Sequence, residues 1–288
     1  MSARPSRCLR PVLLMLASLL LLSCTRLDLA YRNLDVLVPW SLSDYLDMDR
    51  QQKRWLDERL KEQLAWHCKT QLPGYLTWLD GIRQMVASNQ VTDQQLRERT
   101  GQAHQAVARV AERITPQAAE LLRGMNDEQV RELRQNFARD IEKRQAWYVR
   151  TPLAQQIEER GARMEKRLSP WLGGLSPQQK ERVAAWSAQL GGQNRQWIAN
   201  RAHWQAQFSQ LMEQRHQDDF EPRLGQLLKE RERFWTPEYR IAFASTEAHL
   251  RSLLVDLMAQ SSTEQRQHLD QRLDKVRKDF SELKCLKR

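Results

Sequence analysis

One short pattern recurs along the chain and predicts where its helices begin. A residue with a side-chain oxygen is followed three positions later by glutamine at Asn126–Gln129, Ser176–Gln179 and Ser262–Gln265, and Thr92–Gln95 has a similar form. In such a capping box the first side chain accepts a hydrogen bond from the fourth backbone amide, and the glutamine reaches back to the first amide. The spacings between the boxes are unequal, so we interpret them as one reused helix start rather than a repeat array.

The segments that follow have the period of amphipathic helices. Apolar or small residues return in steps of four and three from Leu96 to Ile114, which is typical of a coiled-coil seam. Thr115-Pro116 then predicts the start of a further short helix, with proline in its first position. No segment alternates with period two, and glycine and proline number only ten each. The sequence therefore predicts an all-α fold, an elongated multi-helix bundle of about eight to ten helices with coiled-coil-like seams.

The N-terminus predicts export and a lipid anchor. Three arginines precede an apolar run, Pro11–Leu22, which is too short to span a membrane and typical of a signal-peptide core. Leu21-Leu22-Ser23-Cys24 resembles the lipobox of bacterial lipoprotein precursors. That resemblance implies cleavage after residues 1–23 and acylation of the Cys24 thiol and amine, and more than one acyl chain gives stable anchoring. The alternatives are an ordinary secreted protein cut near Cys24, or an uncleaved anchor helix.

The residues after Cys24 indicate a location and partners. Thr25 follows the cysteine, and the lack of an Asp there resembles cargo sorted to the outer membrane, so we expect the protein to face the periplasm. Residues 24–43 form the lipidated N-terminus and a short adapter, with apolar side chains able to dock on a helical domain over 44–288. Glycine pairs suggest a hinge around 173–192. The formal charge of +10 favours an anionic envelope lipid or another envelope protein as partner, while export excludes nucleic acid.

Two cysteines remain in the mature chain for other uses. Cys8 leaves with the leader and Cys24 carries the lipid, which leaves Cys68 and Cys285. Two thiols in an oxidising compartment favour a disulfide, here between the first long helix and the last. The alternative is two unrelated buried thiols.

A block near the start of the mature chain carries a family resemblance. Its features are Tyr31-Arg32-Asn33, Trp40, Asp44-Tyr45, Asp49 with Gln52, Trp66-His67 and Leu72-Pro73 with Tyr75. Further on, Thr151-Pro152-Leu153, Trp171-Leu172-Gly173 and Leu175–Gln179 also fit. These residues resemble an uncharacterised family of Gram-negative lipoproteins, known only as a domain of unknown function. The resemblance implies an anchored helical protein and supplies no activity and no catalytic residues.

The motifs of common enzymes and metal sites are missing from the sequence. There is no HExxH, CxxC, P-loop, GxGxxG or GxSxG element, and the six histidines are scattered. His216 with Asp218 and Asp219 is the most metal-like group, but helical spacing turns such neighbours apart. The other pairings considered are Trp66-His67 with Cys68, and Asp44 with Asp47 and Asp49, for which a disulfide and helix capping are the better uses. We expect no catalytic residue, cofactor or metal.

Three functions fit these observations. The first is a non-enzymatic envelope lipoprotein that binds or scaffolds another component. The second is an ATP-independent periplasmic chaperone or foldase-like protein, because such helical proteins have helix starts similar to Leu175–Gln179. The third is an enzyme that acts on lipid or peptidoglycan. Ten tryptophans interleave with arginine and lysine, which suits an aromatic groove, although core packing explains most of them better.

Overall fold

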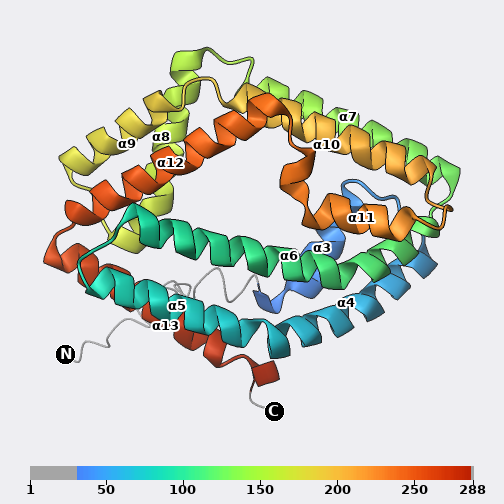
Figure 1. The fold of residues 1–288 in the computed structure, drawn as a ribbon, viewed down its shortest axis with the longest axis horizontal. Coiled ribbons are helices and arrows are strands. Elements are labelled where there is room, and N and C mark those ends of the chain that lie inside the picture. The colour runs from blue at the N-terminus through green and yellow to red at the C-terminus, as the bar shows by residue number, and fades with distance from the viewer. Residues whose placement is uncertain (1–30, 287–288) are drawn as a thin grey trace, which may run out of the picture.

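Helices make up most of residues 31–286, the part of the chain that this computed structural model describes (Figure 1). These residues form eleven α-helices and two short 3₁₀ helices, and they contain no strand. The all-α fold predicted from the sequence is therefore confirmed. The leader, the lipobox and Cys24 lie outside the described residues.

The helices run in chain order with short connections between them. Their bounds are α3 (Leu34–Ser43), α4 (Arg50–Thr70), α5 (Leu72–Ala87), α6 (Asp93–Arg123), α7 (Asp127–Tyr148), α8 (Leu153–Leu172), α9 (Pro177–Gln189), α10 (Asn194–Glu213), α11 (Phe220–Lys229), η1 (Arg231–Phe234), α12 (Pro237–Ala259), α13 (Thr263–Ser281) and η2 (Lys284–Leu286).

The predicted capping boxes are present, and their glutamines also bond to one another in two pairs. Gln52, from a further box at the start of α4, donates to Gln129 of α7 with Nε2 and Oε1 3.2 Å apart. Gln179 of α9 and Gln265 of α13 pair in the same way at 3.0 Å. Each glutamine also donates to a backbone carbonyl in the segment that precedes its partner's helix. The boxes therefore join helix starts that are far apart in the chain.

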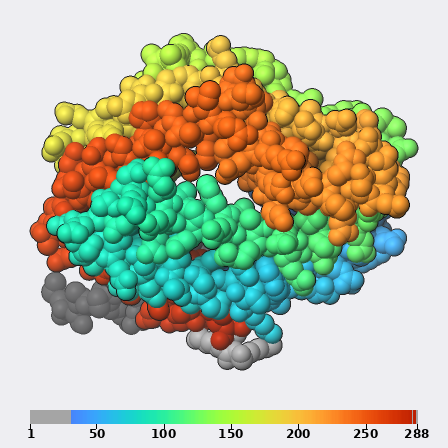
Figure 2. Space-filling model, in the orientation of Figure 1, coloured from blue at the N-terminus to red at the C-terminus, as the bar shows by residue number. Residues whose placement is uncertain are grey.

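The helices pack in pairs that follow one another around the molecule (Figure 1). α5 lies along α13, α8 along α9, α7 along α10 and α6 along α11, while α12 contacts both α9 and α10. The space-filling view shows the surface hollowed between α6 and the start of α12 (Figure 2). None of the described helices is long and apolar enough to cross a membrane.

Buried apolar side chains gather in separate clusters instead of one continuous core. The largest joins α4, α6, α7, α10 and α11 and includes the fully buried Phe220 and Leu224. A second lies between α9 and α12 around Val183 and Leu253. The third surrounds Cys68, where the ends of α4 and α13 meet. The three clusters lie between different helices, so the described residues form several small apolar cores and not one continuous core.

The predicted helix start at Thr115-Pro116 is wrong, because α6 runs unbroken through Pro116. Proline removes one backbone hydrogen bond from a helix, but packing supplies most of the stability of helices in proteins. Here α6 packs closely against α11: a Cβ added at Gly225 would lie 3.3 Å from the Thr115 methyl group. The Thr115 hydroxyl also donates to the carbonyl of Ala111 at 2.7 Å. Tertiary contact therefore overrides the local signal.

The expected docking of the adapter is right for part of it and wrong for the rest. Tyr31 packs against the cluster around Cys68, and Leu34 and Val38 are half-buried. Val36 and Trp40 are 63% and 66% exposed, respectively, so they do not dock on the body. The reason is helical geometry, because residues four apart share a face of a helix. Leu34 and Val38 therefore lie on the half-buried face of α3, and Val36 and Trp40 lie on another face.

Candidate functional site

A cavity of about 800 Å³ lies between α5, α6 and α13 and is called the His67 cavity below. This volume is within the range of small-molecule binding sites. Its walls are mainly aliphatic and aromatic, and none of the described residues that line it is acidic. The apolar lining includes Leu72, Leu76, Leu79 and Ile82 from α5, Ala103, Ala106 and Val107 from α6, and Leu273, Val276 and Phe280 from α13.

The α6 wall of this cavity is the stretch that the sequence predicts to be a coiled-coil seam. Ala103 and Val107 belong to that seam, yet Ala103 is exposed and Val107 is 55% exposed. A seam normally buries such residues in a partner helix. Here no helix fills the space in front of them, and the seam becomes one side of a cavity.

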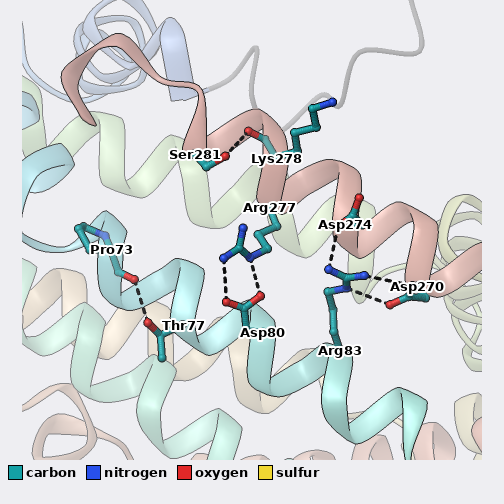
Figure 3. Close-up of polar contacts among 9 residues, drawn as sticks. All are labelled: Pro73, Thr77, Asp80, Arg83, Asp270, Asp274, Arg277, Lys278 and Ser281. Atoms are coloured by element: carbon teal, nitrogen blue, oxygen red, sulfur yellow. Dashed lines mark hydrogen bonds and ion pairs between the residues drawn. The ribbon is translucent and has the colours of Figure 1, made fainter. Parts of the chain in front are cut away.

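Ion pairs between α5 and α13 hold the opposite wall in register (Figure 3). Arg83 of α5 donates to Asp270 at 2.9 Å and to Asp274 at 2.7 Å, both on α13. In the other direction, Arg277 of α13 donates to Asp80 of α5, and this hydrogen bond is the main reason that the pKa of Asp80 lies below its usual value. Because these side chains are partly exposed, they fix the alignment of the two helices more than they add stability.

A histidine between two phenols supplies polar groups to the cavity. His67 Nδ1 lies 3.0 Å from the Tyr31 hydroxyl, and His67 Nε2 lies 3.2 Å from the Tyr75 hydroxyl. Burial lowers the pKa of His67. Burial, followed by the neighbouring Tyr75, raises the pKa of Tyr31 to about 12. The imidazole is therefore neutral, with one ring nitrogen accepting from a phenol and the other donating to one.

The cysteine pair lies directly beside this histidine. Cys68 follows His67 on α4, and Cys285 lies on η2 at disulfide distance, with the two Cα atoms 6.2 Å apart. The geometry that the expected disulfide requires is thus present. Leu72, Leu283 and Phe280 pack around the pair, so it joins the end of the chain to the wall of the cavity.

Two arginines of α6 give the cavity its positive charge. Arg99 donates to Gln102 at 3.1 Å, and Arg109 donates to Gln71 at 3.2 Å. Among the described residues neither arginine forms an ion pair with a carboxylate. The absence of a side chain at Gly81 makes room for Arg99, since a Cβ there would lie 2.6 Å from its guanidinium group. An apolar cavity with unpaired cations suits a ligand that has a hydrocarbon part and an anionic group.

The structure brings together residues that sequence reasoning had left apart. Tyr31, His67 and Tyr75 appear in the sequence analysis as parts of a family resemblance, and His67 also as a possible partner of Cys68, but their spacing does not indicate that the three meet. Trp78 and Trp171 line the cavity, whereas Trp186 lies in the core. No group of three His, Cys, Asp or Glu side chains in residues 31–286 could hold a metal ion, and the His216 group is included in that range.

Comparison with known proteins identifies a family but no activity. A family model described as "Family of unknown function (DUF6279)" matches residues 44–240. The matched range includes α5 and α6 of the cavity and ends before α13. No curated protein matches the chain, and no solved structure does.

Proposed function

The chain belongs to this family of unknown function, and we propose that it is a lipid-anchored, non-enzymatic binding protein of the cell envelope. Its ligand is an amphiphile whose hydrocarbon chain enters the His67 cavity and whose anionic group meets Arg99 and Arg109. The observation that carries this proposal is the pairing of an apolar cavity of about 800 Å³ with two arginines that have no carboxylate partner within residues 31–286.

The position of the anchor supports the same function. Tyr31 lines the cavity and follows Cys24 by only seven residues. Seven residues span at most about 25 Å when fully extended. Acylation of Cys24, at the outer membrane with the domain in the periplasm, would keep the cavity close to a source of anionic lipid. Palmitate labelling tests this part, since Cys24→Ala should abolish it and unchanged labelling would refute the anchor.

Tryptophan fluorescence can test the cavity directly. Undecanoic acid that carries bromine at its far end should quench Trp78 and Trp171, because bromine quenches indoles that it contacts and both rings line the cavity. The variant with Trp78→Phe and Trp171→Phe should lose most of this quenching. Replacing Arg99 and Arg109 with glutamine should lower the affinity for the acid by about tenfold or more, because a hydrogen bond to a charged group contributes more than a neutral one. Unchanged affinity in that variant would contradict the proposed function.

An ATP-independent chaperone is the second candidate. The observation in its favour is the exposed apolar wall at Val107, which an unfolded client could cover. The purified protein should then suppress aggregation of an unfolded client at equimolar ratio, and excess undecanoic acid should block that effect. Failure to suppress aggregation would leave only the binding function.

A further inference from the structure

A second cavity, of about 470 Å³, is lined by side chains of the largest apolar cluster and has no part in the proposed function. It is called the Gln63 cavity below. Side chains from α3, α4, α6, α7, α10 and α11 line it, and they include Val38, Leu56, Leu121, Phe137, Trp204 and Leu224. None of the described residues that line it is acidic. Its walls would hold a hydrocarbon as well as those of the His67 cavity do.

Two glutamines in this cavity have oxygen atoms without hydrogen-bond partners. Gln63 of α4 is 9% exposed, and its buried Oε1 atom accepts no hydrogen bond from any residue that the structure describes. The Oε1 atom of Gln117, on α6, is in the same condition. Both residues line the Gln63 cavity. A buried acceptor without a donor destabilises the folded state by about 1–3 kcal/mol, so two in one apolar cavity need an explanation.

Other buried glutamines of the chain show that such oxygens are normally satisfied. Gln129 and Gln179 are 7% and 0% exposed, and the Oε1 atom of each accepts from the backbone of its capping box. Gln156, which is 8% exposed, likewise accepts from Asn194 through its Oε1 atom at 3.2 Å. Gln260 has a third such oxygen elsewhere in the described residues, but those of Gln63 and Gln117 share one apolar cavity, where a single bound molecule can supply donors to both.

The arginines of this cavity select against an anionic ligand. Arg201 is paired with Asp140, with Nε and Oδ2 2.6 Å apart, and Arg59 is paired with Glu62 at 2.8 Å. A second arginine, Arg144, also binds Asp140 at 2.8 Å. Each arginine that lines this cavity is thus paired with a carboxylate, whereas Arg99 and Arg109 of the His67 cavity are not paired with one among the described residues. A neutral ligand therefore meets no arginine of the cavity wall that lacks a carboxylate partner.

We propose that the Gln63 cavity is a second binding site, for a hydrocarbon-bearing molecule with uncharged hydrogen-bond donors such as a hydroxyl or an amide N–H. The hydrocarbon packs among the leucine and aromatic side chains, and the donors bond to the oxygens of Gln63 and Gln117. This site differs from the His67 cavity in the head group that it accepts.

The probe is undecanol brominated at its far end, which matches the acid above in chain length and differs only in its head group. The background is the variant with Trp78→Phe and Trp171→Phe, in which Trp55 and Trp204 still report from the Gln63 cavity. The alcohol should quench this fluorescence, and Trp204→Phe should remove much of the effect. The acid should bind at least about tenfold more weakly, as measured by the concentration that it needs for the same quenching, because burying its charge in this cavity is unfavourable.

Gln63→Leu combined with Gln117→Leu provides the decisive variant. Affinity for the alcohol should fall by about tenfold or more because its donor loses both acceptors. The midpoint of thermal unfolding without ligand should stay the same or rise, since two unsatisfied groups are removed.

Equal affinity in this variant, or equal quenching by acid and alcohol, would overturn the proposal. A lower melting midpoint would also overturn it, because it would mean that water already satisfies both oxygens. None of these outcomes involves Trp78 or Trp171, so failure here is distinct from failure at the His67 cavity.

Discussion

The His67 cavity and the Gln63 cavity share two helices but differ in chemistry. α4 and α6 contribute to both, and both are lined mainly by apolar side chains. In the first, Arg99 and Arg109 have no carboxylate partner among the described residues, while in the second Arg59 and Arg201 are paired. The difference shows that selectivity in such a fold comes from a few polar side chains, whereas the hydrocarbon-binding walls come from the apolar faces of the surrounding helices.

The largest expected effect follows from removing the cysteine pair, which should lower the stability of the chain and weaken ligand binding in the His67 cavity alone. Replacing Cys68 and Cys285 with alanine removes a link that spans 217 residues, for which the chain-entropy model gives about 5 kcal/mol of unfolding free energy. Urea unfolding should show this loss. The brominated acid should bind more weakly, because η2 and Phe280 are released from the cavity wall, while the brominated alcohol keeps its affinity. An equal loss for both probes would show that the two cavities are not independent.

Buried glutamines give the next largest effect, with opposite signs in the two environments. Gln129→Leu should lower the unfolding free energy by about 1–3 kcal/mol, because it leaves the capping amide of α7 and the carbonyl of Asp47 without partners. Gln63→Leu makes the same chemical change at an unpartnered oxygen and should leave stability unchanged or raise it. The two variants serve as controls for each other in urea unfolding. A loss of equal size in both would remove the distinction between satisfied and unsatisfied glutamines.

A smaller effect should follow from moving Arg99 without deleting it. Gly81→Ala places a methyl group where the Arg99 guanidinium now lies, and that flexible side chain can turn away at little cost in stability. Alanine also favours helix over glycine by about 1 kcal/mol. The brominated acid should therefore bind less tightly in a protein that is no less stable. Gly101→Ala on α6 is the matched control, since nothing lies within 4 Å of its added Cβ. Equal acid binding in both variants would show that Arg99 does not meet the ligand.

The fold class was predictable because helix starts and apolar periods are local signals. Each capping box needs only four neighbouring residues, and the structure has every one of them at a helix start. The pairing of Gln52 with Gln129 was not predictable, since it depends on two helices meeting in space. The helix start predicted at Thr115-Pro116 was wrong for the same reason, because α6 stays helical there through the packing of Thr115 against Gly225 of α11.

The candidate sites were largely hidden from sequence reasoning for a physical reason. A line of apolar residues such as Ala103, Val107 and Ile114 predicts that something covers it, but it does not say whether that is a helix or a ligand. Likewise, Gln63 and Gln129 are the same residue type on helices, and only their surroundings make one unsatisfied. Cys68 and Cys285 were the exception, because few other uses remain for two cysteines in an exported chain.

The smallest expected effect is the contribution of His67 and Tyr31 to the pH dependence of stability. Burial lowers the pKa of His67 in the folded chain, so the unfolded chain takes up a proton first as the pH falls below about 6.5, and stability declines there. On the alkaline side, the pKa of Tyr31 at about 12 means that the unfolded chain loses its phenol proton first above pH of about 10, which lowers stability again. His67→Gln should reduce the acid slope of the melting midpoint, and Tyr31→Phe should reduce the alkaline slope. If neither slope changes on these substitutions, the neutral His67 and Tyr31 pair does not set the polarity of this cavity.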